Sequence, residues 1–172
     1  MRAFSIGAAT SDFLRPFTFY LDDFVDRAPG AGEPIYQMAN EKLESGRWGD
    51  AEMLYRIVLC LDPNRTQGYG NLGTTLYKQN RFWEAARCYL RVLDTDPHDL
   101  IVLYHLAMTR TRLGDFDGAE TLIRDIVSID TAGSMYELIS SNPELRPVRE
   151  SAECRRLLDV YRRVHDASPA GG

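Results

Sequence analysis

The sequence has few of the features that mark secreted or membrane-spanning proteins. Its three cysteines, Cys60, Cys88 and Cys154, are odd in number and widely spaced, which fits neither a disulfide framework nor a paired CxxC metal site. No apolar run approaches the roughly 18 residues that a membrane-spanning helix needs. Residues 1–9 hold one arginine and only a short apolar stretch, too little for a secretory signal peptide. These absences predict a cytoplasmic protein without membrane insertion.

Positive charge is also scarce. Lysine occurs only at Lys42 and Lys78, and 20 basic residues against 25 acidic ones give a net charge of −5 and a pI near 5.2. Binding to the phosphates of a nucleic acid, or to an anionic membrane surface, requires a surplus of lysine and arginine. We therefore expect no nucleic-acid partner and no attachment to an acidic membrane.

Sequence motifs of catalysis are missing as well. There is no phosphate-binding loop, no dinucleotide fingerprint and no HExxH or GxSxG arrangement. The three histidines, His98, His105 and His165, lack metal-ligand spacing to one another or to a cysteine. Adjacent carboxylates such as Asp22 and Asp23 point about 100° apart on a helix, so they form no paired acid and base. We expect no enzyme activity, no cofactor and no metal site.

What the sequence does contain is an internal repeat. Its 44% hydrophobic and 26% charged residues are typical of one soluble globular domain. A shift of 34 residues aligns one long segment with itself three times without gaps. Five columns carry this alignment: Ala39, Gly73 and Ala107; Gly46, Asn80 and Gly114; Trp48, Phe82 and Phe116; Ala51, Ala85 and Ala119; and Asp62, Asp96 and Asp130.

The first four columns have a steric reason in a pair of antiparallel helices. Gly46, Asn80 and Gly114 suit a sharp turn, because they tolerate the left-handed conformation. The small residues of the first and fourth columns allow two helices to approach closely. The aromatic column fills the space near the turn, and Pro63 and Pro97 stop the second helix. Apolar spacing between these markers is helical, and no strand alternation competes with it. An all-α fold follows.

These units resemble tetratricopeptide repeats, whose signature runs through a Leu-Gly pair, an alanine, an aromatic residue and a closing proline. The unit 66–99 matches best, whereas 32–65 carries Ala39 for glycine and 100–133 ends in Thr131 instead of proline. The resemblance covers about 102 of 172 residues. It implies an α-solenoid of three helix-turn-helix units, 32–65, 66–99 and 100–133.

Segments on both sides of the repeats are predicted to be helical too. Residues 1–31 contain an aromatic amphipathic helix, Ser11–Arg27, followed by a linker, 28–34. This helix caps the solenoid, self-associates or occupies the protein's own groove, and the sequence leaves the three open. Residues 134–166 are predicted to form C-terminal capping helices, because a repeat array otherwise ends in an exposed apolar face. Residues 167–172 are predicted to be a disordered tail.

The resemblance also implies a peptide-binding groove, because first helices of successive repeats line a concave surface in this family. By register the groove residues are Tyr36, Asn40, Gly70, Asn71, Thr74, Tyr77, Ile101, Tyr104 and Met108. Tyrosine suits peptide binding, since it offers a large contact area with a polar tip. Ordinary packing between repeats is the alternative explanation for the tyrosines.

One partner class can be examined from the sequence. Tetratricopeptide domains that bind the acidic tails of heat-shock chaperones use two asparagines and several cationic residues as a carboxylate clamp. Asn40 and Asn71 match these asparagines, but Tyr36, Ile101 and His105 stand at the cationic positions. Neutral amides do not compensate a buried carboxylate as charged donors do. We expect no clamp activity.

The sequence therefore predicts a protein-protein interaction module, an adaptor or small chaperone, that binds an apolar or amphipathic partner segment in the concave groove. The overall layout also resembles, more weakly, the translocator chaperones of bacterial type III secretion. Two alternatives remain open: a scaffold that assembles into a homo-oligomer through the N-terminal helix, and an accessory subunit of a larger complex.

Overall fold

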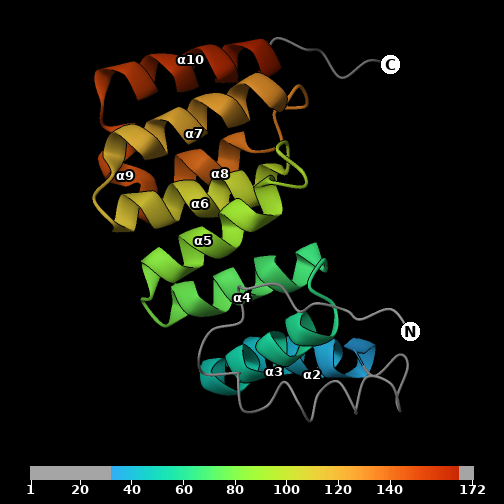
Figure 1. Cartoon of the computed structure of the whole chain (residues 1–172). Coiled ribbons are helices and arrows are strands. Elements are labelled where there is room, and N and C mark those ends of the chain that lie inside the picture. Colours follow the sequence, from blue (N-terminus) through green and yellow to red (C-terminus); the bar gives the residue numbers. More distant parts are fainter. Residues whose placement is uncertain (1–31, 167–172) are drawn as a thin grey trace.

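The structure is a computed structural model that describes residues 32–166, and all regular secondary structure in this range is helical (Figure 1). Six helices form three consecutive antiparallel pairs: α2 (Gly32–Glu44) with α3 (Trp48–Leu61), α4 (Thr66–Lys78) with α5 (Phe82–Leu93), and α6 (Leu100–Arg112) with α7 (Phe116–Ile129). The pairs stack from the α2 end of the molecule to the α7 end. This confirms the predicted all-α solenoid.

Left-handed residues make the turn inside each pair. Gly46, Asn80 and Gly114 have φ of +74°, +61° and +79°, and each ends the first helix of its pair. Side chains with a Cβ rarely adopt this conformation, and asparagine is among those that tolerate it best. The structure therefore confirms the three turn positions predicted from the 34-residue column.

Small residues hold the two helices of each pair close together. The side chains of Ala39, Ala51, Ala85, Ala107 and Ala119 are fully buried. Gly73 is a point of close contact, because a Cβ added there would lie 2.7 Å from Cε1 of Tyr89 on the facing helix. The Tyr89 ring thus fills the volume that any larger residue at 73 would need.

The aromatic column differs from its prediction. Trp48 and Phe116 do not fill the space near the turn, since 39% and 47% of their surface is exposed. Phe82 is half-buried, packs edge-on against Tyr77 and lies beneath the guanidinium group of Arg112. Of the three aromatic residues, Phe82 is therefore the one that is partly enclosed, because Arg112 of the third pair covers its ring.

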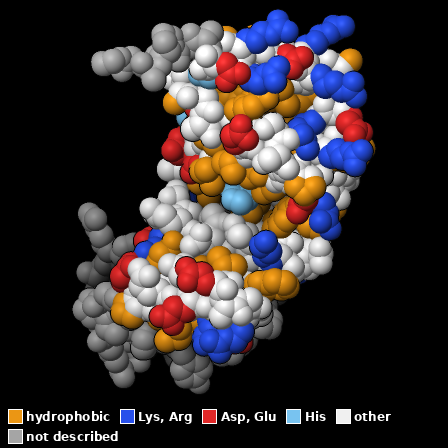
Figure 2. All heavy atoms as spheres, turned by 180° about the vertical axis from the view of Figure 1, so that it is seen from behind, with side chains coloured by type: hydrophobic (Ala, Val, Ile, Leu, Met, Phe, Trp, Pro, Cys, Tyr) orange, Lys and Arg blue, Asp and Glu red, His pale blue; other side chains and the backbone are white. Residues whose placement is uncertain are grey.

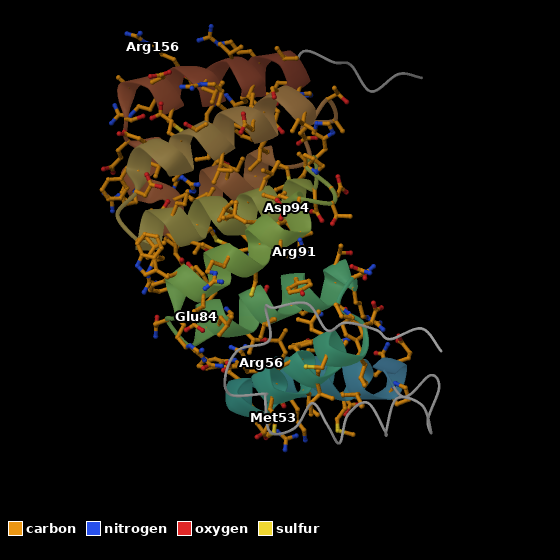
Figure 3. All side chains as sticks on the ribbon, viewed as in Figure 1. Met53, Arg56, Glu84, Arg91, Asp94 and Arg156 are labelled. Carbon is orange, nitrogen blue, oxygen red and sulfur yellow. The ribbon has the colours of Figure 1, made fainter. Side chains whose placement is uncertain are left out.

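Polar contacts connect α3 to the α4–α5 turn and to α5 of the next pair. The Glu52 carboxylate on α3 accepts hydrogen bonds from Arg81 at 2.6 Å and from Gln79 at 3.0 Å. Arg56 and Glu84, labelled in Figure 3, add a 3.8 Å ion pair between α3 and α5. These side chains are partly exposed, so the pairs contribute little to stability. They orient one helical pair on the next.

The chain after α7 forms a shorter and broken helical unit. It comprises α8 (Tyr136–Ser141), the 3₁₀ turn η1 (Pro143–Leu145), α9 (Arg146–Arg149) and α10 (Ala152–Asp166). Asn142 interrupts the helix: its extended backbone precedes Pro143, and its side chain caps η1 by accepting from the Glu144 amide at 2.8 Å. α10 then packs against α7. In this last helix Cys154, Leu158 and Tyr161 are buried, whereas Val164 is 59% exposed.

Asp130 anchors this C-terminal unit at the end of α7. Its carboxylate is 3% exposed and accepts hydrogen bonds from the Met135 amide at 2.7 Å, from the Ser134 hydroxyl at 3.1 Å and from the Tyr161 hydroxyl. A buried carboxylate is tolerated only when such donors replace water. The three donors come from the α7–α8 loop and from α10, so one residue fixes both segments.

Some predictions fall outside the described residues. The Ser11–Arg27 helix and the tail at 167–172 lie there and stay predictions. The predicted linker 28–34 is wrong at its end, because α2 already begins at Gly32. Pro34 is compatible with this start, since the first turn of a helix needs no amide donor. None of the helices within 32–166 is long and apolar enough to cross a membrane.

We predict that Gly73→Ala lowers the free energy of unfolding by about 1–3 kcal/mol, because the added methyl group collides with Tyr89. Gly70→Ala is the matched control in the same helix, where nothing lies within 4 Å of the added carbon. That variant is expected to gain up to about 1 kcal/mol from helix propensity. Urea unfolding followed by circular dichroism measures both, and equal changes in the two variants would contradict the steric account.

We also predict that Asp130 makes stability depend on pH. Burial raises the pKa of its carboxyl group, but hydrogen bonds from Tyr161, Met135 and Ser134 outweigh burial and lower the pKa below its usual value. The ionised group therefore stabilises the fold above the unfolded pKa of about 3.9, and this contribution is lost as the pH falls through the lower, folded pKa.

Asp130→Asn is expected to cost about 1–3 kcal/mol at pH 7 and to flatten the loss of stability between about pH 5 and pH 3. Asp125→Asn, on the exposed side of α7, is the control and should keep the wild-type profile. Urea unfolding at a series of pH values provides the measurement. An Asp130→Asn profile parallel to that of the wild type would show that the carboxylate has no such role.

Candidate functional site

A hollow of about 410 Å³ lies where the first helices of the three pairs meet. α4 contacts both α2 and α6, so residues from all three helices reach this space. The lining residues are Tyr36, Thr66, Gln67, Gly70, Asn71, Thr74, Tyr89, Val92, Thr95, Asp96, Asp99, Ile101, Val102 and His105, called the inner pocket below. Figure 2 shows the molecule bending and narrowing at its middle, with hydrophobic side chains interspersed among charged ones.

Five of the nine predicted groove residues line the inner pocket: Tyr36, Gly70, Asn71, Thr74 and Ile101. Gly70 forms an open stretch of helix surface, since no atom lies within 4 Å of the position where a side chain would begin. Ile101 is 50% exposed. Helical register therefore predicted these five lining residues, which come from α2, α4 and α6.

Asn40 lies behind the pocket in a network of hydrogen bonds. The side-chain amide of Asn71 donates to the Tyr36 hydroxyl at 3.0 Å and to Asn40 Oδ1 at 2.9 Å. The Tyr55 hydroxyl also donates to Asn40 Oδ1, at 2.7 Å. Burial raises the pKa of Tyr55 to about 12, which keeps this hydroxyl protonated as a donor at neutral pH. The network joins α2 to α4 and engages both asparagines within the protein.

The opposite wall contains Tyr89 and His105. The Tyr89 ring stacks on the imidazole of His105 with centroids 5.7 Å apart and an angle of 12° between the planes. The Tyr89 hydroxyl lies 3.3 Å from the Thr74 hydroxyl. Burial lowers the pKa of His105, and the nearby Lys78 adds to this while Asp99 opposes it. The imidazole is therefore neutral near pH 7. Tyr89 is only 1% exposed, so the partly exposed His105 and Thr74 are the accessible side chains of this wall.

Three predicted groove residues lie elsewhere. Tyr104 and Met108 are each only 8% exposed, because the Asn142 amide covers them by donating to the Tyr104 hydroxyl and to the Met108 sulfur. The Tyr77 hydroxyl donates to the Glu144 carboxylate. Residues 136–145 thus pack on this part of α6 and α4, which corrects the prediction that these three side chains line an open groove.

The predicted groove did not include the lining residues that come from α5 and from the connection between α5 and α6. Tyr89 and Val92 come from α5, and Thr95, Asp96 and Asp99 come from the α5–α6 connection. Tyr89 reaches the pocket because Gly73 has no side chain to exclude its ring. The glycine at 73, in a column that holds alanine in the other two units, was the available sequence indication.

A second hollow, of about 440 Å³, lies over the α2–α3 turn and is lined by Gly46, Arg47, Trp48, Gly49, Asp50 and Gln79. None of the predicted groove residues lines it. In the part of the chain that the structure describes, no group of three or more histidine, cysteine, aspartate and glutamate side chains is arranged to hold a metal ion.

Known proteins similar to this chain share its helical repeats. Tetratricopeptide repeat protein 21A of Mus musculus is 24% identical over 173 aligned residues, which take in 95% of this chain but only 13% of that relative. The crystal structure of MamA superimposes with a TM-score of 0.66 at 16% identity and covers 90% of this chain and 91% of MamA.

The type III secretion chaperone SycD of Yersinia enterocolitica, solved with a peptide of the translocator YopD, gives a TM-score of 0.59 at 16% identity over 76% of this chain and 91% of SycD. Residues 71–134 match the tetratricopeptide repeat family. This range begins after the unit 32–65, where Ala39 departs from the family pattern. Residues 71–134 therefore match tetratricopeptide repeats, and the described residues as a whole have the helical-solenoid fold of these similar proteins.

Proposed function

We propose that this protein is a protein-interaction module, an adaptor or small chaperone, that binds an apolar or amphipathic segment of a partner protein in the inner pocket. The observation that carries the proposal is the pocket itself, formed jointly by three successive first helices. Its volume of about 410 Å³ falls in the range of about 300–1,000 Å³ that is common for ligand sites. A space of this size accepts a few side chains of a bound segment.

The chemistry of the walls suits a polypeptide. Tyr36 offers aromatic surface with a polar tip, and Ile101, which is 50% exposed, supplies an apolar contact. Tyr89, Val92 and Val102 are buried and form the base of the pocket. Gln67 also lines the pocket, and its side-chain amide can both donate a hydrogen bond to a peptide backbone and accept one from it. The open helix surface at Gly70 lets a backbone approach closely. Binding without catalysis is the activity that such a pocket supports.

A chaperone version of this proposal is supported by the similarity to SycD, which binds a peptide of a translocator. Co-purification with a hydrophobic secreted protein is its expected consequence. Three free cysteines, one of them buried, support a cytoplasmic setting. The scaffold alternative depends on residues 1–31, outside the described range, and the accessory-subunit alternative depends on an unidentified partner. Both stay hypotheses.

Gly70→Leu tests the proposal, because a leucine side chain at this position occupies the pocket while the helix gains stability. We expect affinity for peptides selected by display on the full-length chain to fall at least about tenfold, or about 1.4 kcal/mol. Thermal stability should be unchanged or higher, since leucine is a better helix former than glycine. Fluorescence anisotropy and thermal unfolding provide the two readouts.

Gly49→Leu is the matched control, because Gly49 is also helical, has nothing within 4 Å and lies outside the inner pocket. It should bind the selected peptides as the wild type does. If Gly70→Leu binds them with unchanged affinity, or if both variants lose affinity equally, the peptides bind elsewhere and the assignment of the inner pocket is refuted.

A further inference from the structure

We propose that the inner pocket accepts a lysine or arginine side chain of the bound segment, so that the protein selects apolar segments that contain a basic residue. This inference rests on the proposed function and adds the charge of the ligand to it. Asp96 and Asp99, on the α5–α6 connection, would hold the cation, and the aromatic walls would pack against its aliphatic stem.

Local hydrogen bonds hold both carboxylates in place and leave them able to accept more. One oxygen of Asp96 accepts from the His98 amide at 3.1 Å, and one oxygen of Asp99 accepts from the Val102 amide at 3.0 Å, where it caps α6. A carboxylate has about four acceptor sites, so each group retains capacity for a donor from a ligand. Asp96 is exposed and Asp99 is half-buried, and both line the pocket.

Cations within the protein do not neutralise this pair at the pocket wall. No lysine or arginine is among the described residues that line the pocket. Arg65 lies beside it, but its guanidinium group pairs with Glu33 at 2.6 Å and stacks 3.9 Å above the Tyr36 ring. Lys78 is exposed in the last turn of α4, is not among the lining residues, and lies near enough to lower the pKa of His105. The lining itself therefore has a formal charge of −2 from two carboxylates.

The aromatic walls favour the same ligand. Tyr36 and His105 line the space and are partly exposed, whereas Arg65 covers one face of the Tyr36 ring and the buried Tyr89 ring stacks on His105. The remaining ring surface packs against the aliphatic stem of a lysine or arginine, and an aromatic ring stabilises a cation above its negative face. Because burial lowers the pKa of His105, its imidazole carries no charge near pH 7 and does not repel a cation. A bound carboxylate, by contrast, would face Asp96 and Asp99 without a charged donor in the lining.

A segment of this chain is a less suitable occupant than a partner. Residues 11–27 contain four aspartates and two arginines, so their net charge is −2, the same sign as the pocket lining. Like charges brought together in a desolvated site disfavour binding. The charge of the pocket therefore points to a basic segment of a partner.

The test measures binding of the full-length chain to four libraries of random decapeptides whose central residue is fixed as arginine, lysine, leucine or glutamate. We expect the arginine and lysine libraries to bind about tenfold more tightly than the leucine library at low salt. One charge-assisted hydrogen bond to Asp96 or Asp99 is enough to raise the affinity about tenfold. The glutamate library should bind most weakly. Raising the salt concentration should reduce the preference.

The variant Asp96→Asn with Asp99→Asn removes both charges but keeps both local hydrogen bonds, since asparagine accepts and caps as aspartate does. It should reduce the preference for a basic residue to about twofold or less and leave the leucine library unaffected. Asp62→Asn with Asp115→Asn is the matched control. Asp62 accepts a hydrogen bond from the Asn64 amide at 3.1 Å, as Asp96 does from the His98 amide. Asp115 caps α7 by accepting from the Gly118 amide at 3.0 Å, as Asp99 caps α6, and neither control residue lines the pocket.

Three results would overturn the inference in distinguishable ways. Equal binding of the arginine and leucine libraries, or a preference that survives the Asp96→Asn/Asp99→Asn change, would refute the charge selectivity and leave the proposed function standing. Tightest binding of the glutamate library would identify an acidic segment, such as residues 11–27, as the occupant. Binding of none of the four libraries to the wild type would refute the proposed function together with this inference.

Discussion

The contact between Gly73 and the ring of Tyr89 is the constraint on which the rest of the structure depends. It fixes the spacing of α4 and α5 in the central pair, which contacts both neighbouring pairs. Because position 73 has no side chain, the Tyr89 ring lies across the interface between the helices. Its hydroxyl then reaches Thr74 and its face stacks on His105. One steric contact therefore sets both the packing of the middle repeat and one wall of the inner pocket.

Much of the fold could be predicted from the sequence because its determinants are local or repeat at a fixed interval. A left-handed turn needs glycine or asparagine whatever surrounds it, so Gly46, Asn80 and Gly114 mark the turns without knowledge of the tertiary structure. The buried alanines follow from the same argument, since only small residues fit between closely packed helices. Register alone then placed Tyr36, Gly70, Asn71, Thr74 and Ile101 on the pocket side.

The rest of the site depends on contacts between residues far apart in the sequence. Helical register does not show that Asn142, some 34 residues after Met108, folds back over it and over Tyr104. The break at Asn142 and Pro143 causes this, because it divides what would be the first helix of a fourth unit into short pieces that pack on α6 and α4. The sequence marked Asp96 as part of a repeat column but predicted neither Asp96 nor Asp99 at the pocket, because loop positions follow from how two helical pairs stack. Among the described residues, residues 136–145 cover the concave side at Tyr104 and Met108, and none covers Gly70 or Ile101.

The central claim is that a partner segment binds where the three first helices meet. Backbone-amide NMR of the full-length chain, titrated with a peptide selected by display, tests it most directly because it maps the contact surface without any substitution. The account predicts that the largest chemical-shift changes fall on Gly70, Asn71, Thr74 and His105, with small changes at the covered Tyr104 and Met108. Changes concentrated instead on the outer surface of α5 around Trp83 and Leu90, whose side chains are 73% and 44% exposed, would contradict it.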